Sequence, residues 1–96
     1  MRYECRPGLV LTKICGEWLL IPTRKAFEDC PCVVHLSLPT VLVWKMIEKG
    51  KNEEEIRKAI SVLTHKDEQK VIEMTNSIMQ SFIEKKAIIV LEDDDD

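Results

Sequence analysis

Residues 33–50, VVHLSLPTVLVWKMIEKG, decide how the rest of the chain can fold. The first four residues are mostly β-branched or aliphatic, which is typical of a short strand. Ser37 then offers a side-chain oxygen that can cap a helix, and a proline falls in the first turn, where a missing N–H does no harm. The next run is apolar nearly all round, with Trp44 at its centre, and Gly50 can end it in a left-handed conformation. The stretch therefore predicts one strand that leads directly into one buried helix, residues 38–49.

Two more strands are predicted before this stretch. Residues 8–14, GLVLTKI, and residues 18–21, WLLI, are rich in β-branched and aliphatic side chains. Only three residues separate them, so we expect a hairpin. Residues 1–7 carry no pattern, and residues 23–31 form a polar stretch with a proline at each border, which predicts an irregular loop.

Two amphipathic helices are predicted after it. Asn52 can cap the first, and three glutamates fill its opening turn, where carboxylates suit the positive end of the helix dipole. The other helix is expected over residues 66–86, and residues 88–91 suit either a last short strand or an extended tail. The predicted fold class is α+β, a winged helix-turn-helix-like domain with three short N-terminal antiparallel strands followed by three helices.

Length and charge limit the class of protein. The chain of 96 residues suits one domain, expected over residues 1–91, followed by an acidic disordered tail at residues 92–96. No run reaches the ~18 apolar residues of a membrane span, and the N-terminus lacks the apolar core of a signal peptide. We therefore expect a cytoplasmic protein, no membrane contact, and reduced thiols for the four cysteines.

The last predicted helix carries an unusually wide apolar arc. Its members cover roughly 180° of the helical wheel, whereas an ordinary surface helix needs ~100°. They are Val71, Ile72, Met74, Thr75, Ile78, Met79, Phe82 and Ile83. Two interpretations remain open: the whole arc packs into two layers of core, or one flank lines an exposed groove for a partner.

The third predicted strand is a candidate docking edge. Val33, Val34, His35 and Leu36 include no lysine or proline that would prevent another chain from pairing with an exposed edge. Beside an apolar helix flank, such an edge would form a cleft for an extended peptide. The alternative is that the loop of residues 23–31 covers this edge.

The sequence contains no recognisable catalytic or metal-binding motif. Cys30 and Cys32 form a C-x-C pair, but Cys5, Cys15, His35 and His65 do not complete a recognised zinc spacing. There is no nucleophile–base–orienter set and no glycine-rich phosphate loop. We therefore expect no enzyme activity, catalytic residue, metal or cofactor, although a small redox or zinc-binding domain stays open as an alternative.

A DNA-binding winged helix is the main rival hypothesis, because the last two helices have a helix-turn-helix outline. Without residues 92–96, the chain has 14 basic and 12 acidic groups, so its body is close to neutral. The last helix also contains no arginine. Both observations argue against nucleic acid as a partner, because DNA binding favours a basic face.

The order and spacing of several segments resemble the PqqD-like family, the precursor-peptide recognition elements of ribosomally made, post-translationally modified peptides. The similarity covers about residues 8–92. The matching segments are GLVL at residues 8–11, GEWLLIP at 16–22, VHLS at 34–37, WKMIE at 44–48, EEEI at 53–56 and FIEKKAI at 82–88. Ser37 stands where the family usually has asparagine, and it keeps a side chain that can cap the helix.

This resemblance implies a peptide adaptor without catalysis or cofactor. The leader of a precursor peptide would pair as an extra strand with the third strand and lie in the groove against the third helix. The domain would then present the precursor to a modifying enzyme, such as a radical S-adenosylmethionine protein or the leader peptidase of a lasso-peptide pathway. The expected peptide-binding residues are Val33, Val34, His35, Leu36, Val71, Thr75, Ile78, Met79 and Phe82.

Overall fold

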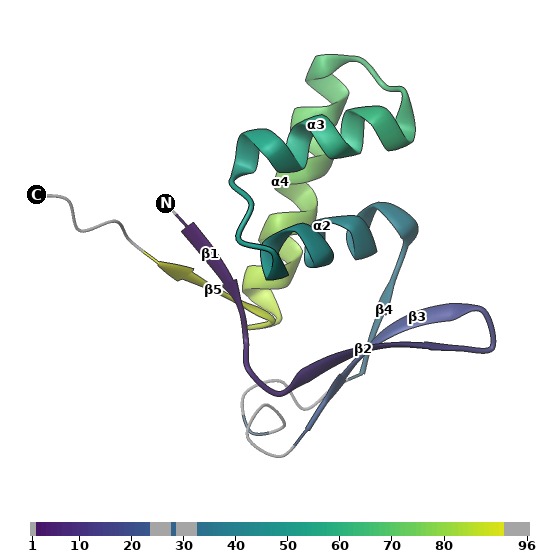
Figure 1. The fold of residues 1–96 in the computed structure, drawn as a ribbon, viewed down its shortest axis with the longest axis vertical. Helices are drawn as coiled ribbons and strands as arrows, with labels where there is room; N and C mark the ends of the chain where they lie inside the picture. Colours follow the sequence, from purple (N-terminus) through teal and green to yellow (C-terminus); the bar gives the residue numbers. More distant parts are fainter. Residues whose placement is uncertain (1, 24–27, 29–32, 92–96) are drawn as a thin grey trace, which may run out of the picture.

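The computed structural model describes residues 2–23, 28 and 33–91. Three strands form an antiparallel sheet and three helices follow it, which confirms the predicted α+β fold (Figure 1). The strands are β2 (Leu9–Ile14), β3 (Glu17–Pro22) and β4 (Val34–Leu36), and the helices are α2 (Leu38–Glu48), α3 (Glu53–Thr64) and α4 (Glu68–Glu84).

A second, two-stranded sheet was missed in part by the sequence analysis. Strand β1 (Arg2–Cys5) pairs antiparallel with β5 (Ile88–Leu91), in a register that places Cys5 opposite Ile88. Residues 1–7, for which the sequence showed no pattern, therefore include a strand, and of the two alternatives for residues 88–91 the structure has the short strand rather than the extended tail. The short polar β1 has no pattern of its own, because its partner comes from the other end of the chain. Figure 1 shows the two strands side by side, next to the lower end of α4.

Local chemistry explains both ends of α2. At its C-terminus, Gly50 has φ 78° and donates its N–H to the Ile47 carbonyl, while Lys51 donates to the Met46 carbonyl. These two bonds make the Schellman motif, as the glycine predicts. At the N-terminus, Ser37 is the capping residue but its side chain accepts no backbone N–H. Its hydroxyl lies 2.8 Å from the Thr40 hydroxyl instead, so the expected side-chain cap is wrong.

Side-chain caps fix the other two helices. Asn52 accepts the N–H of Glu55 at 2.9 Å, as predicted. Asp67 accepts the N–H of Lys70 at 2.9 Å, so α4 begins at Glu68 rather than at residue 66. Because each cap satisfies an N–H that has no partner inside its helix, it contributes about 1 kcal/mol to helix stability.

The core lies where α2 meets the sheet and the other two helices. Figure 1 shows α2 between the three-stranded sheet and α3, with α4 passing both helices. Trp44 of α2 is fully buried, and its ring centroid lies 5.5 Å from that of Phe82 in α4. Leu20 comes from the sheet and Ile60 from α3, and both have no exposed surface. The apolar stretch around Trp44 is therefore the centre of the domain, as predicted.

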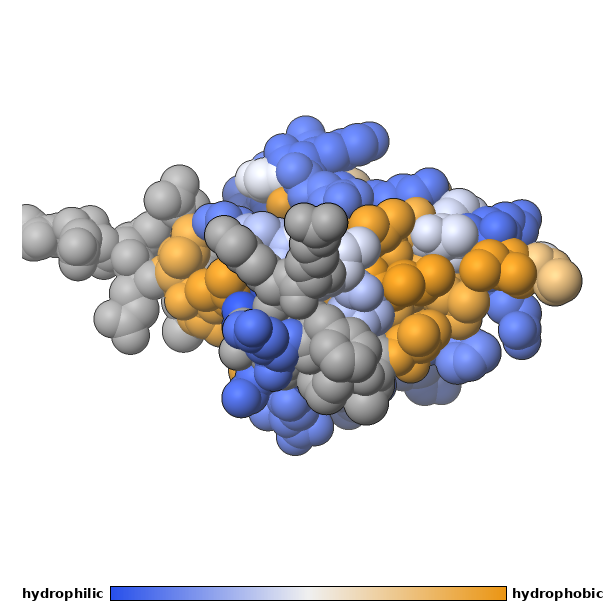
Figure 2. Space-filling model, turned by 90° about the horizontal axis from the view of Figure 1, so that it is seen from below, coloured by the Kyte–Doolittle hydropathy of each residue, from blue (hydrophilic) through white to orange (hydrophobic). Residues whose placement is uncertain are grey.

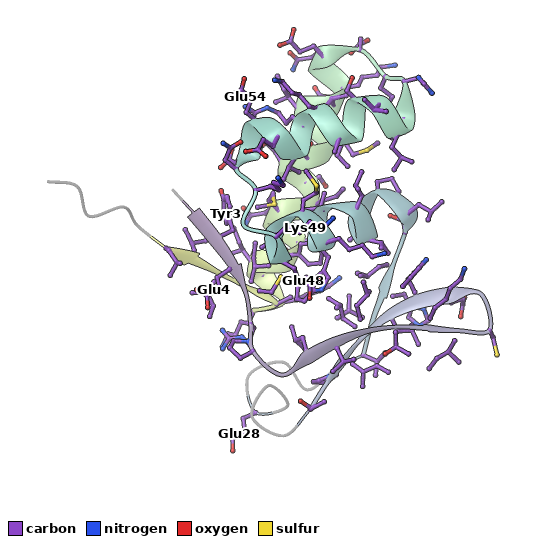
Figure 3. All side chains as sticks on the ribbon, viewed as in Figure 1. Tyr3, Glu4, Glu28, Glu48, Lys49 and Glu54 are labelled. Carbon is purple, nitrogen blue, oxygen red and sulfur yellow. The ribbon has the colours of Figure 1, made fainter. Side chains whose placement is uncertain are left out.

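A partly buried tyrosine links β1 to α3. The Tyr3 hydroxyl donates a hydrogen bond to Oε1 of Glu53 at 2.6 Å, and Figure 3 shows Tyr3 reaching from β1 toward the start of α3. Burial, and then the hydrogen bond and negative charge of Glu53, raise the pKa of Tyr3 to about 12. The folded state therefore holds this proton more tightly than the unfolded chain does, where the pKa is 10.0.

The Tyr3–Glu53 link predicts a specific loss of stability at high pH. Its contribution is fully present below pH 10 and is lost as the pH rises to about 12. In Tyr3→Phe we expect a lower free energy of unfolding at pH 8, by about 1 kcal/mol, and a smaller further loss between pH 10 and 12. Urea unfolding of both proteins at matched pH measures this difference. Parallel curves for the two proteins above pH 10 would contradict it.

Candidate functional site

Strand β4 is an edge of the three-stranded sheet, as predicted. The strand order is β2-β3-β4, and Trp18, Leu19 and Leu20 of β3 lie opposite Leu36, His35 and Val34. Within residues 2–23, 28 and 33–91, no strand pairs with the other side of β4. The alternative that residues 23–31 cover this edge falls mostly outside the described residues.

The hairpin between β2 and β3 determines which backbone groups point toward β4. Its two loop residues, Cys15 and Gly16, have φ angles of 51° and 80°, the left-handed values of a type I′ turn. The closing pair, Ile14 and Glu17, therefore exchanges backbone hydrogen bonds. In an antiparallel ladder such pairs alternate with pairs that do not bond to each other. Trp18 and Leu20 consequently direct their N–H and C=O groups away from β2.

The far end of the hairpin confirms this alternation independently. Counted along the register, Gly8 and Thr23 form another bonded pair, and the Thr23 N–H does donate to the Gly8 carbonyl at 2.8 Å. Pro22, which has no N–H, lies opposite Leu9 at a position where the ladder to β2 needs none. The assignment therefore holds over the whole length of β3.

The same alternation, continued into β4, identifies His35 as the residue whose backbone groups face the free edge. Trp18 and Leu20 face β4, so their partners Leu36 and Val34 direct their backbone groups toward β3. His35 lies between these two and directs its N–H and C=O toward the free edge. The same alternation gives Ser37 this orientation, but its carbonyl already accepts the Val41 N–H at 2.9 Å. The free edge thus offers a backbone donor and acceptor at His35.

The side chains in and next to β4 alternate between the core and the solvent. Val34 and Leu36 are buried in the core, whereas His35, and Val33 just before the strand, are exposed. Of the four predicted docking residues, two therefore fix the strand to the domain. His35, with Val33 beside it, faces outward and is available to a partner chain.

The structure brings the five predicted α4 residues together on one buried arc. Thr75 is 1% exposed, and the most exposed member, Ile78, reaches only 9%. All but Thr75 belong to the core cluster, which agrees with the two-layer interpretation of the wide arc. The five residues are Val71, Thr75, Ile78, Met79 and Phe82. Their role in peptide binding stays a prediction, and the free protein does not expose them.

The half-buried flanks of this arc were not among the predicted site residues. Met74 lies on one flank and Ile72 on the other, roughly 160° apart at 100° per residue. Ile72 lines a hollow together with Arg57 and Ser61, so its flank faces α3. Met74 is one of the partly buried side chains that pack against the core cluster. Ile72 and Met74 are both half-buried, so their positions relative to α3, rather than their burial, distinguish the two flanks.

The exposed side of α4 has the wrong charge for DNA. Its charged members are three acids, Glu68, Glu73 and Glu84, and one base, Lys70. A phosphate backbone would meet net repulsion on this surface. The DNA-binding alternative therefore gains no support from the described residues.

The described cysteines do not form a reactive site. Burial, followed by the charges of Glu48 and Glu4, raises the pKa of the Cys5 thiol to about 12, so this thiol stays protonated and unreactive near neutral pH. Cys15 is exposed in the hairpin turn. Among residues 2–23, 28 and 33–91, no three metal-ligating side chains gather into a possible site. The predicted Cys30–Cys32 pair lies outside this part of the chain.

Comparison with known proteins identifies the fold. No protein-family model matches this sequence, and no curated protein matches it significantly. Among solved structures, the chain is similar to TbiB1, whose structure was determined in complex with the TbiA(beta) leader peptide. The TM-score is 0.74 at 20% sequence identity, over 94% of this chain and 99% of TbiB1. The two proteins therefore share a fold. No helix in the described part of the chain is long and apolar enough to cross a membrane.

Proposed function

We propose that this chain is a non-catalytic adaptor that binds the leader of a precursor peptide, as the resemblance to the PqqD-like family implies. The observation that carries the proposal is the free edge of β4, where His35 directs its N–H and C=O outward. The fold shared with TbiB1, a protein that was solved with a leader peptide, supports it.

The leader would bind as a fourth strand. Its main chain would pair with the backbone of His35, and each net hydrogen bond is worth about 1 kcal/mol. Alternate side chains of an added strand point to opposite faces of the sheet. Those that point to the inner face would meet the core edge formed by Val34 and Leu36. The resemblance adds α4 to this groove, and its half-buried Met74 is the contact that we propose there. Main-chain pairing would give affinity, and the apolar contacts would select the sequence.

The remaining parts of the proposal concern partners. The adaptor would act in the cytoplasm and present its bound precursor to a modifying enzyme, such as a radical S-adenosylmethionine protein or a leader peptidase. It would need no cofactor, because positioning the peptide requires no bond to be made or broken. The modifying enzyme would supply the chemistry.

An amide-resolved NMR titration tests the binding mode directly. The titrants are leader peptides of the short precursors encoded beside this gene. We expect shifts at Val33–Leu36 and around Met74 that saturate at micromolar peptide or below. If no such peptide shifts β4, the proposed function fails. A DNA duplex is the comparison titrant, and salt-sensitive shifts along α4 would favour the DNA-binding alternative instead.

Adjacent residues of α4 allow a matched test of the helix flank. We expect Met74→Glu to weaken leader binding by about 10-fold, because it places a charge on an apolar contact. Ile72→Glu makes the same change on the α3 side and should leave leader affinity unchanged. Isothermal titration calorimetry measures both, and equal effects would remove Met74 from the site.

Thr75→Val is the control for the buried arc. Its hydroxyl oxygen is buried without a hydrogen-bond partner, so we expect valine to raise the free energy of unfolding by about 1 kcal/mol. Leader affinity should not change. A loss of affinity in this stable variant would return Thr75 to the peptide site.

A further inference from the structure

A second apolar surface lies between the three-stranded sheet and the helices. It is a hollow of about 210 Å³, here named the Trp18 groove, formed where β3, α2 and α3 meet. Its lining residues are Trp18, Leu38, Val41, Leu42, Lys45 and Leu63. Leu38 is 63% exposed and Leu63 44%, so two large apolar side chains stand at its rim in contact with water.

Two lysine side chains lie over the aromatic ring of Trp18 in this groove. Nζ of Lys45 lies 4.9 Å from the centroid of the Trp18 ring, and Nζ of Lys13 lies 5.5 Å from it. Each cation–π contact contributes about 0.5–1 kcal/mol at an exposed site and restricts its lysine. The two ammonium groups are no more than about 10 Å apart, because both lie close to one ring. This separation is close to one Debye length at physiological ionic strength, so both lysines would attract the same approaching carboxylate.

A neighbouring hollow connects the Trp18 groove with the edge of β4. It has a volume of about 500 Å³, shares Trp18 and Leu38 with the Trp18 groove, and is also lined by Lys13, His35 and Glu17. Among the described residues that line the two hollows, Glu17 is the sole acid. The surface therefore combines an apolar floor with a local excess of positive charge, although the whole chain has a net charge of −3.

We propose that the Trp18 groove docks an acidic, apolar segment of a partner protein. A leucine or isoleucine of that segment would lie between Leu38 and Leu63, and flanking carboxylates would pair with Lys45 and Lys13. An apolar floor beside two lysines suits a protein segment better than nucleic acid, because a phosphate backbone offers nothing to bury against Leu38 and Leu63. This surface is additional to the proposed peptide edge.

The Trp18 groove and the free edge of β4 use different residues. Trp18 belongs to β3, which pairs with one side of β4, whereas the free edge is the other side. No residue of β4 lines the groove itself, but His35 lines the neighbouring hollow. A leader added at the edge and a segment docked in the groove would therefore lie next to each other.

A displayed library of random 12-residue peptides, selected against the full chain, tests this inference. We expect selected peptides that combine leucine or isoleucine with aspartate or glutamate. Their affinity should fall at least about 10-fold for Lys45→Glu and for Leu63→Ser. Lys58→Glu removes an exposed lysine of α3 outside the groove and should change the affinity less than twofold. Selected peptides without acidic residues, or equal binding by all three variants, would overturn the inference.

Two further measurements separate this inference from the proposed function. Selected peptides should bind Met74→Glu normally, because Met74 lies on α4 and lines neither of the two hollows. If the selected peptides lose binding to Met74→Glu but still bind Lys45→Glu, they occupy the proposed leader site, and the groove is overturned as a docking surface. Sedimentation analysis of the protein alone provides the other test. If the protein self-associates and Lys45→Glu abolishes this self-association, the groove binds a second copy of the chain. That result would also overturn the proposal of a separate acidic partner.

Discussion

His35→Pro is expected to remove leader binding while the domain stays folded. Proline lacks an N–H, and the alternation in the sheet directs the His35 N–H toward the free edge rather than toward β3. The domain therefore loses no ladder hydrogen bond, and edge strands accept proline in this orientation. A bound leader would lose the donor for one of its carbonyls and would meet the proline ring. An unsatisfied group of this kind costs about 1–3 kcal/mol, so we expect a loss of affinity on the order of 100-fold.

Two matched variants make this result specific. His35→Ala removes the imidazole but keeps the N–H, and it should bind the leader nearly as well as the wild type. Val34→Pro removes an N–H that points toward β3, so it should lower stability directly. Calorimetric titration gives the leader affinity, and urea unfolding followed by circular dichroism shows which variants fold. A folded His35→Pro protein with wild-type affinity would exclude the β4 edge as the docking site.

This prediction depends on a register that the sequence alone did not supply. The short connection around Cys15 and Gly16 was sufficient to predict a hairpin, because few loop lengths join two adjacent strands. Which residues of β4 face outward depends on how β4 aligns with β3, and that alignment is a tertiary contact across the loop of residues 23–31. The sequence therefore located the edge but treated Val33, Val34, His35 and Leu36 as equivalent.

The helices show the same division between local and non-local information. Caps at Asn52 and Gly50 and the apolar run around Trp44 are local signals, and they predicted the three helices to within about two residues. Strand β1 was missed because its pairing partner lies at the other end of the chain. On α4, periodicity identified an apolar arc but could not separate the fully buried Met79 from the half-buried Met74, because the depth of burial depends on what packs against each residue.

Trp44→Ala is expected to be the most destabilising single substitution. The side chain has no exposed surface and packs against Phe82 with a ring-centroid distance of 5.5 Å. Its removal should cost about 3–5 kcal/mol, because the surrounding elements cannot close the resulting cavity. A domain of this size has only about 5–15 kcal/mol in total, so a large fraction of the variant should be unfolded at 37 °C. Urea unfolding at 10 °C measures the loss while the protein is still folded.

Trp44→Phe separates the volume of this side chain from its polar atom. The indole Nε1 is buried without a hydrogen-bond partner, so phenylalanine removes an unsatisfied donor while it keeps most of the ring packing. We expect a cost of about 1–2 kcal/mol, well below that of alanine. Because α2 follows β4 after a single residue, loosening Trp44 should also release the edge strand. Leader affinity should therefore fall in Trp44→Ala and persist in Trp44→Phe. Equal stability of the two variants would show that the core is not centred on this ring.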